Sequence, residues 1–519
     1  MSTDNQNTKG NAAPEGQAYA EDVSEQRQIR REKLKALQEA GRNPFLQETW
    51  DVTAHSRDIK DNYVAMEGEE VSIAGRIMTK RVMGKASFFD IQDKQGRIQC
   101  YVKRDEIGTE EYKWFKTYDI GDIVGIRGIV FKTRTEEISV HVHELVLLTK
   151  SIQVLPDKWS GLKDPDLRYR ERYVDLIMNE KVRDTFIKRA KIEHEIRRVL
   201  EEDYGFLEVT TPTLATIAGG GNARPFITHH NTLDIDMYLR IATELYLKRC
   251  IVGGLDRVYE MGKVFRNEGM DQRHNPEFTS MECYMAYGNL ESVMDVVEQI
   301  VYKCQMAVNG TPIISYQGKE FDVTPPWNRL DMTDGVKQIT GIDFHKIDSD
   351  EDARRAAVDY GMDPEAVKDW TRGKIIAEMF EDYCEDAPGL LDGRIPVFVT
   401  GHPVEVSPLA KRDPEDPRIT RRFEVYINGW EVGNAFSELN DPIDQYERFA
   451  EQQRELDLGL DDEAHPMDRD FVNALEVGMP PTGGLGIGVD RLVMLLTDEP
   501  SIRDVILFPT MKTKDEKNA

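Results

Sequence analysis

The spacing of apolar and polar residues divides the chain into segments of different character. Residues 1–22 are polar and rich in Asn, Gly, Ala and Glu, and they predict a disordered N-terminus. Ser24 then opens a charged run with helical periodicity, and Gly41 predicts its end. Residues 23–70 are therefore predicted to form a helical extension.

Residues 71–150 change to short strands in which apolar and polar residues alternate. Five such runs are separated by turn signals, including the sequence DKQG at 93–96 and the pair Gly121-Asp122. Five short strands with glycines at the corners predict a small closed barrel, and the OB-fold is the commonest five-stranded candidate. Barrels of this type often bind single-stranded nucleic acid, although a purely structural β-domain would show the same pattern.

Residues 151–179 contain prolines, a glycine and dense charge, which predict a linker. A long amphipathic helix follows at about 180–203, where Val182 and Phe186 begin an apolar stripe with i, i+4 spacing. Gly205 is a natural end for this helix, and a short β-type run comes after it.

The sequence from 180 to 511 continues as an alternation of strand hairpins and helices. Within it, residues 341–390 are acidic and helical in pattern, and they interrupt β-rich sequence on both sides. We interpret these residues as an insertion. Residues 512–519 form a polar tail.

Composition limits the class of protein. The 519 residues suit two or three domains. No apolar run approaches the roughly 18 residues of a membrane span, and the N-terminus lacks the apolar core of a signal peptide. The five cysteines are scattered, odd in number and form no CxxC pair. This usage predicts a reduced, cytoplasmic protein without a structural zinc site.

The net charge of −27 argues against general nucleic-acid binding, which needs a basic footprint. A footprint need only be local, however. Residues 71–89 contain Arg76, Lys80, Arg81 and Lys85 and no acidic residue. This run is either part of a nucleic-acid interface or an ordinary solvated face.

The stretch at 257–287 reads as an antiparallel hairpin with a long polar loop. Three cationic or donor side chains mark the loop end: Arg266, Arg273 and His274. Arginine there suits bidentate contact with phosphate or carboxylate. Because side chains alternate along a strand, four residues of the returning strand share one face: Phe278, Ser280, Glu282 and Tyr284. A solvated hairpin with incidental charges is the alternative.

The stretch at 421–441 contains Asn428-Gly429 between apolar runs, which predicts a two-residue type I′ hairpin. Such a hairpin places Glu424 and Glu431 on one sheet face, where Mg²⁺ is the natural cation between them if a phosphorylated substrate is present. Three further residues share one face by period two: Asn434, Phe436 and Glu438. Both sets can serve one site only if a bulge occurs, and Gly433 is the predicted place. Glutamates that simply face solvent are the alternative.

The stretch at 480–509 is a glycine-rich strand that leads into an apolar helix. Gly484, Gly486 and Gly488 lack side chains at alternate positions, so a flat ligand could lie against that face, and Arg491 starts the helix. The spacing matches neither a dinucleotide-binding fingerprint nor a P-loop. Together the three stretches predict a sheet-based pocket for a nucleoside triphosphate and a small cationic substrate.

The chain resembles class II aminoacyl-tRNA synthetases at three motifs, which occur in the family's order along the sequence. The helix at 180–203 with its following strand is similar to motif 1, FRNEG and RHNPEFT to motif 2, and GLGIGVDRL to motif 3. The sequences GGGNARPFITHHN, LRIATELYLKR, MECYMAY and GNAFSELND resemble the lysine-specific, bacterial-type members, over about residues 25–510. This family usually has proline where this chain has Thr243, which puts only the local turn in doubt.

The resemblance implies an α+β fold, with an antiparallel sheet and flanking helices preceded by an OB-fold barrel, and a homodimer built through motif 1. It implies a lysine–tRNA ligase that uses ATP and Mg²⁺ and acts on tRNA(Lys) away from membranes. A protein-lysylating relative would lack the barrel, and an inactive regulatory relative would have lost motif arginines. Both alternatives therefore fit the sequence less well.

Site residues follow from the resemblance position by position. Those implied to bind ATP are Arg266, Arg273, His274, Phe278, Glu424 and Arg491, of which Arg266 and Arg491 are catalytic. Those implied to bind lysine are Gly220, Glu244, Arg266, Glu282, Tyr284, Asn434, Phe436 and Glu438. Mg²⁺ is implied at Glu424 and Glu431. In the barrel, the implied anticodon-binding residues are Arg76, Phe88, Gln99 and Glu144.

Overall fold

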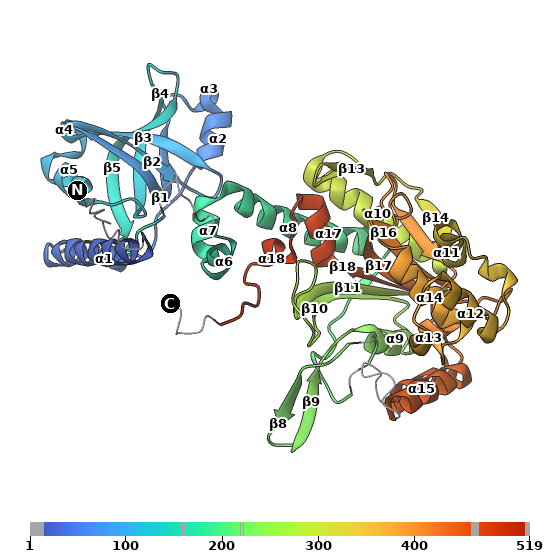
Figure 1. Cartoon of the computed structure of the whole chain (residues 1–519). Helices are drawn as coiled ribbons and strands as arrows, with labels where there is room; N and C mark the ends of the chain where they lie inside the picture. The colour runs from blue at the N-terminus through green and yellow to red at the C-terminus, as the bar shows by residue number, and fades with distance from the viewer. Residues whose placement is uncertain are drawn as a thin grey trace, which may run out of the picture. The chain divides into compact units, whose positions relative to one another are not determined.

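The computed structural model describes residues 15–156, 162, 164–217, 219–221, 223–457 and 467–513. The chain forms two compact units, Met1–Gly161 and Leu162–Ala519. Figure 1 shows both, with the N-terminal unit in blue and cyan. Each unit has a core of its own, so each is described separately.

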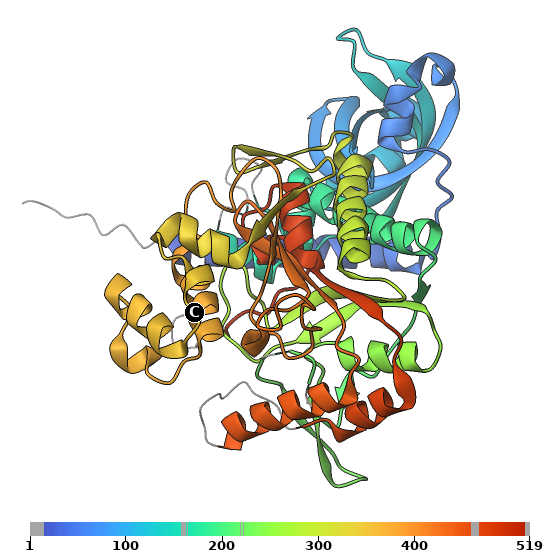
Figure 2. The ribbon, with the colours of Figure 1, turned by 90° about the vertical axis from the view of Figure 1, so that its right-hand side faces the viewer.

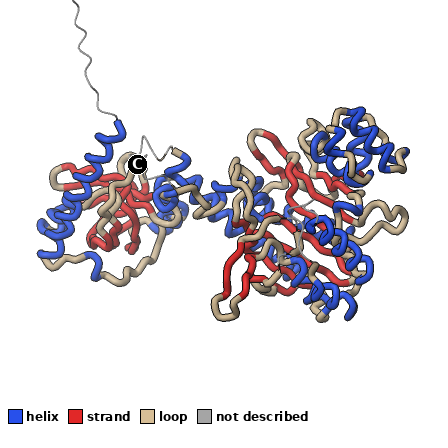
Figure 3. Tube along the Cα trace, turned by 60° about the horizontal axis from the view of Figure 1, so that its bottom comes forward, coloured by secondary structure: helices blue, strands red, loops and turns tan. Residues whose placement is uncertain are grey.

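The N-terminal unit is built on a closed five-stranded barrel with the strand order β1-β2-β3-β5-β4. Its strands are β1 (Glu70–Met83), β2 (Ala86–Gln92), β3 (Arg97–Lys103), β4 (Ile123–Lys132) and β5 (Ile138–Thr149). Helices α4 (Arg104–Ile107) and α5 (Thr109–Thr117) connect β3 to β4. Figure 3 shows the strands in red with helices around them. The alternating burial of β2 and β3 confirms that apolar residues fill the barrel.

The helical extension packs on this barrel and starts earlier than the sequence predicts. Helix α1 (Glu15–Glu39) includes residues 15–22, so the prediction of disorder there is wrong, while residues 1–14 lie outside the described part. Alanine, glutamate and glutamine in residues 15–23 favour the helix, so it begins before Ser24. Gly41, at φ 73°, ends it as predicted. The short elements that follow are η1 (Pro44–Leu46), α2 (Ser56–Asp61) and α3 (Tyr63–Met66).

The C-terminal unit contains an eight-stranded sheet in the order β14-β15-β16-β17-β18-β11-β10-β6. Its strands are β6 (Leu207–Glu208), β10 (Arg257–Phe265), β11 (Glu277–Ala286), β14 (Asn328–Asp331), β15 (Val397–Thr400), β16 (Arg422–Ile427), β17 (Trp430–Ser437) and β18 (Thr482–Gly488). The six strands from β15 to β10 pair antiparallel, as the class II resemblance implies.

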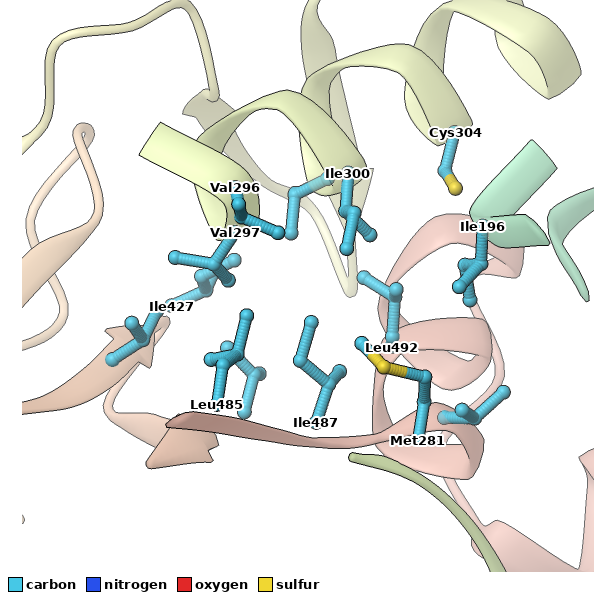
Figure 4. Close-up of a cluster of buried hydrophobic side chains, with 14 of the residues drawn as sticks. Ile196, Met281, Val296, Val297, Ile300, Cys304, Ile427, Leu485, Ile487 and Leu492 are labelled. Atoms are coloured by element: carbon cyan, nitrogen blue, oxygen red, sulfur yellow. The ribbon is translucent and has the colours of Figure 1, made fainter. Parts of the chain in front are cut away.

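One face of this sheet is apolar and is covered by helices. The covering helices are α8 (Glu180–Arg198) with its π-helical end η2 (Val199–Asp203), α10 (Leu290–Asn309) and α17 (Val489–Thr497). In Figure 4, Leu485 and Ile487 of β18 point toward Val297 and Ile300 of α10. Because strand side chains alternate, the apolar residues that hold the helices leave every second residue on the opposite face.

A buried ion pair and its hydrogen bonds join α8, β11 and α17. The guanidinium of Arg189 in α8 pairs with Asp490 of α17 and donates to the Thr279 hydroxyl of β11, at 3.0 Å. Asp490 in turn accepts from the Thr279 backbone N–H at 2.6 Å. Helix α8 thereby fixes where β11 and α17 lie.

The predicted linker at 151–179 is wrong for its second half. Residues 165–178 form α6 (Pro165–Arg170) and α7 (Arg172–Met178) within the C-terminal unit. Arg172 is fully buried, pairs with Asp175, and donates to the carbonyls of Arg503 and Leu507. Charged residues of this segment therefore bond to a distant segment inside the protein. Composition alone cannot distinguish such residues from charged residues that face solvent.

The predicted insertion is a helical cluster with its own core. It comprises α11 (Met332–Thr340), η3 (Phe344–Lys346), α12 (Asp350–Tyr360), α13 (Pro364–Val367) and α14 (Arg372–Tyr383). These helices pack on one another and on β15, and Figure 2 shows them in yellow and orange. The helical segment therefore begins at Met332, somewhat before the predicted residue 341.

The remaining elements are β7 (Leu214–Ala215), β8 (Ile227–His230), β9 (Ile235–Leu239), α9 (Glu244–Val252), β12 (Ile313–Tyr316), β13 (Lys319–Asp322), η4 (Val404–Val406), α15 (Pro442–Asp457), α16 (Arg469–Gly478) and α18 (Ile502–Val505). Among them, β12, β13 and α18 pack with α17 in the core on the helix-covered side of the sheet. None of the described helices has the length and apolarity needed to cross a membrane. The polar tail from residue 514 onward is outside the described residues.

Candidate active site

The free face of the large sheet holds a cavity of about 290 Å³. The hairpin of β10 and β11, the strands β17 and β18, the start of α17 and the loop around Gly220 all contribute to its walls. The three sequence stretches singled out above therefore meet at one place. The cavity has an acidic end and a cationic end, described in turn.

The β11 face confirms the period-two prediction. Phe278, Ser280, Glu282 and Tyr284 all line the cavity, whereas Met281 and Cys283 point into the apolar core. The antiparallel pairing of β11 with β10 and β18 sets this orientation.

The β16–β17 hairpin confirms both the turn and the bulge. Asn428 and Gly429 have φ of 58° and 71°, as a type I′ turn requires. Tyr426 pairs with Glu431 but Val425 pairs with Gly433, so Val432 is the additional residue of a bulge. The bulge turns Glu431 onto the same face as a second group of cavity-lining residues: Asn434, Phe436 and Glu438.

Three carboxylates and one phenol make up the acidic end: Glu244, Glu282, Glu438 and Tyr284. Glu282 accepts from the backbone N–H of Thr243 at 3.0 Å and from the Tyr284 hydroxyl at 3.2 Å. The turn at Thr243 thus holds Glu282 through a backbone N–H, a hydrogen bond that proline could not donate. Glu438 is fully buried, and among the described residues its Oε1 has no hydrogen-bond partner.

A buried cation lies behind these carboxylates, and the sequence reading missed it. Lys248 of α9 is fully buried, with Nζ 2.5 Å from Glu244 Oε1 and 2.5 Å from Glu438 Oε2. Its spacing of four residues from Glu244 on one helix could have suggested the first pair. No local pattern in the sequence predicts the second pair, between Lys248 and Glu438.

Burial raises the pKa of two carboxyl groups at the acidic end. Burial, followed by repulsion from Glu244, raises the pKa of Glu282 to about 7. Burial raises the pKa of Glu438 to about 8 against the opposing attraction of Lys248. For Lys248, burial acts to lower the pKa, but Glu244 and Glu438 outweigh it and the pKa is raised. An added cation would therefore be strongly favoured here.

The glycines of β18 divide the floor of the cavity. A Cβ on Gly484 would lie 1.9 Å from Glu438 Oε1 and 2.5 Å from Tyr284 Cε1, so that glycine makes room for the acidic end. A Cβ on Gly486 or Gly488 would meet nothing closer than 3.7 Å. The floor open to a flat ligand is therefore limited to Gly486 and Gly488, a smaller area than predicted.

The cationic end collects the predicted donors. The Arg266 guanidinium lies 5.3 Å from the Phe278 ring centre, and Arg273 lies 4.8 Å from that of Trp430. Arg491 donates to the Glu431 carbonyl at 2.8 Å and lies 3.3 Å from His274 Nε2. The loop is ordered by Asp271, which accepts from the backbone N–H groups of residues 273 and 274. This arrangement can bind a polyanion.

The two carboxylates predicted to hold a metal differ in exposure to the cavity. Glu431 lines it, whereas Glu424 lies beside it and accepts from Arg422 Nη2 at 2.5 Å and from the Tyr426 hydroxyl at 2.9 Å. Burial and the Glu424 charge raise the pKa of Glu431. Carboxylate oxygens retain acceptor capacity beside one bond each, so the pair fits a divalent cation. Arg422, missed in the sequence, also donates to Asn434 at 3.2 Å and so connects both ends.

On the barrel, an aromatic strip surrounds the predicted Phe88. Phe88 and Tyr101 lie 4.6 Å apart between ring centres, and Tyr101 lies 5.3 Å from His141. Gln99 lies two residues before Tyr101 on β3 and so shares its face, and Ser139 of the neighbouring strand donates to it at 3.1 Å. Half-buried rings beside a polar side chain suit a splayed base.

Two other predicted barrel residues are not part of this strip. Glu144 pairs with Arg127 and lies further along β5 than Ser139, about 15 Å from it by strand geometry. The structure therefore separates Glu144 from Gln99. Arg76 donates to the Gly121 carbonyl at 2.7 Å, which uses part of its guanidinium structurally.

The basic run is also smaller than predicted. Lys80 donates to three carbonyls at the end of α5, from Phe115, Lys116 and Tyr118. Burial lowers the pKa of Lys80 to about 8. Of the four cations counted in the sequence, Arg81 and Lys85 remain exposed.

Comparison with known proteins accounts for both units. Residues 164–512 match the model of class II tRNA synthetases (D, K and N), and residues 71–148 match that of OB-fold nucleic acid binding domains. The chain belongs to the class II tRNA synthetases. The synthetase fold and the barrel expected from the sequence are thereby confirmed.

Several relatives of this class II synthetase carry the name lysine–tRNA ligase. The one from Thermoanaerobacter pseudethanolicus is 56% identical over 496 residues, covering 96% of this chain and 98% of the relative. That from Clostridium kluyveri is 54% identical and covers 93% and 95%. That from Clostridium acetobutylicum is 56% identical and covers 93% of each.

Proposed function

We propose that the chain attaches L-lysine to tRNA(Lys) through a lysyl-adenylate formed from ATP. Membership of the class II synthetases and the near full-length similarity to lysine–tRNA ligases support the reaction. The acidic end of the cavity is the observation that supports lysine as the substrate. A pocket closed by Glu282, Glu438 and Tyr284 suits an ammonium and would repel a carboxylate or exclude an apolar side chain.

The substrate lysine is proposed to lie between the two ends of the cavity. Its side-chain ammonium reaches Glu282, Tyr284 and Glu438, while Asn434 and Phe436 line the pocket. Its α-amino group is received by Glu244 and the loop at Gly220, where a Cβ would already press on Ala242 at 3.3 Å. Its carboxylate then points to Arg266.

ATP is proposed to occupy the cationic end, with its adenine between Phe278 and Arg491. Arg266 contacts the α-phosphate, and Arg273 and His274 contact the remaining phosphates. Glu424 and Glu431 would hold Mg²⁺, which neutralises phosphate charge when bound.

The chemistry is then positioning and charge neutralisation. A lysine carboxylate oxygen attacks the α-phosphorus, the bond to the β-phosphate oxygen breaks, and pyrophosphate leaves. The attacking carboxylate is already ionised, so this step needs no general base. Arg266 holds both reacting groups and stabilises the charge between them.

The tRNA and a second protomer complete the proposal. Phe88 and its aromatic neighbours would stack anticodon bases, since an OB-fold barrel commonly binds single strands in this way. On α8, Ile187 is 45% exposed, and near it Leu507 lines the same apolar hollow. Such a face suits the homodimer that motif 1 forms in the family. We expect the enzyme in the cytoplasm, where tRNA is charged.

Amino-acid-dependent ATP–pyrophosphate exchange across the twenty amino acids tests the proposal. We expect exchange with lysine and not with arginine or aspartate. Absence of exchange with lysine would refute the substrate. As a sharper measurement, Glu282→Gln should raise the lysine KM far more than the ATP KM. Equal effects on both would mean that Glu282 does not bind the substrate ammonium.

A further inference from the structure

Lys248 is a charged side chain buried in an apolar core, and stability of the fold does not require a charge there. Its neighbours on α9, Leu245, Leu247 and Ile251, belong to an apolar core cluster. An apolar side chain at 248 would fill the same space, and exchanging a buried ion pair for apolar residues is often neutral or stabilising. The carboxylates that Lys248 contacts are those of the proposed lysine pocket, so its charge has a reason in binding.

The oxygens of Glu438 differ in what they contact. Lys248 Nζ takes Glu244 Oε1 and Glu438 Oε2, at 2.5 Å each. Glu438 Oε1 instead lies over Gly484 of the cavity floor, 1.9 Å from where a Cβ on that glycine would be, and it has no hydrogen-bond partner among the described residues. The ammonium thus holds Glu438 by one oxygen and leaves the other toward the substrate.

Charge makes the same point. Without Lys248, Glu244, Glu282 and Glu438 would be three buried carboxylates that repel one another. Like charges in a buried site cannot all remain ionised, so one would take up a proton. A protonated carboxyl attracts an ammonium far less than a carboxylate does.

We propose that Lys248 is a positioning residue of the lysine pocket: it is an internal counter-ion that opposes the repulsion among the pocket carboxylates, binds one oxygen of Glu438 and directs the other oxygen to the substrate ammonium. The inference rests on the proposed lysine specificity. Lys248 itself lies behind the cavity wall, between the rings of Tyr284 and Phe471 at 5.9 Å from each, and does not touch the substrate.

The test compares two neutral variants, Lys248→Met and Lys248→Gln, in the full-length enzyme. Methionine keeps the length and loses the charge, and glutamine keeps N–H donors and thereby protects folding. We expect either variant to raise the lysine KM by ~10²-fold, with the ATP KM changed less than about threefold. Lys150→Met is the matched control, because Lys150 is equally buried between Asp119 and Asp122 in the barrel unit. It should lower thermal stability and leave the lysine KM unchanged.

A pH profile separates this role from a merely structural one. The charged and titratable groups around Glu438 are Lys248 and Glu244 on α9, and Glu282 and Tyr284 on β11. Loss of the Lys248 charge raises the pKa of Glu438 further, so raising the pH restores its ionised form. We therefore expect the lysine KM of either variant to fall more steeply than that of the wild type between pH 6.5 and 8.5.

The outcomes are distinguishable. If the wild type fails to exchange with lysine, the proposed function is wrong. If the wild type exchanges and a folded variant keeps the wild-type lysine KM, the role of Lys248 is wrong. Equal increases in the lysine and ATP KM, or a wild-type pH slope, would also overturn it, because both would indicate a general structural defect.

Discussion

Gly484→Ala should disable the acidic end of the pocket while leaving the nucleotide end intact. The added Cβ would lie 1.9 Å from Glu438 Oε1, and 2.5 Å and 2.7 Å from two carbons of the Tyr284 ring. An ordinary contact needs at least 3.4 Å, so the Glu438 carboxylate must move by more than 1 Å. Its other oxygen is held by buried Lys248, so the movement also disturbs that pair.

The magnitude follows from this displacement. A misplacement of about 1 Å in a positioned group costs ~10²-fold in catalytic efficiency, so kcat/KM for lysine should fall by at least that factor. The overpacked core should lose about 1–3 kcal/mol of unfolding free energy. Pyrophosphate exchange at varied lysine and varied ATP, together with thermal unfolding, measures both quantities.

Gly488→Ala is the matched control for this prediction. It lies on the same strand and face, but its Cβ would meet nothing closer than Arg491 Cβ at 4.0 Å. It should leave the lysine KM unchanged and act, if at all, on ATP. A wild-type lysine KM in Gly484→Ala, or the same loss in both variants, would refute the packing argument.

Two further variants address other parts of the molecule. Arg266→Ala should slow adenylate formation by ~10²-fold or more in single-turnover assays, since the charge between the reacting groups is lost; a rate within threefold of wild type would contradict this. Phe88→Ala should reduce tRNA charging without affecting pyrophosphate exchange, because stacking contributes about 1–3 kcal/mol per base; a parallel loss of exchange would mean a folding defect.

Local patterns in the sequence were sufficient for much of the catalytic sheet. The type I′ turn at Asn428-Gly429, the shared face of Phe278 to Tyr284 and the bulge beside Gly433 were all predicted and are confirmed. Each depends on backbone geometry within a few residues: a positive φ, or the two-residue period of a strand. Such features do not require knowledge of which elements meet.

Charges were the least predictable residues, because a sequence does not show what a charge contacts. Arg172 and Lys80 look like solvated charges, yet they bond backbone carbonyls in the interior. Glu144 matched a family position but lies on another part of the barrel from Gln99, since strand register decides which residues are neighbours.

The sequence by itself determined the family, the order of the motifs and the set of side chains that face the cavity. Only the tertiary structure placed Lys248 of α9 against Glu438, a residue 190 positions later in the chain (438 − 248), and cleared space for that carboxylate over Gly484. The physical reason is that the pKa and orientation of a buried carboxylate depend on its nearest cation and its packing, and both come from elements distant in sequence.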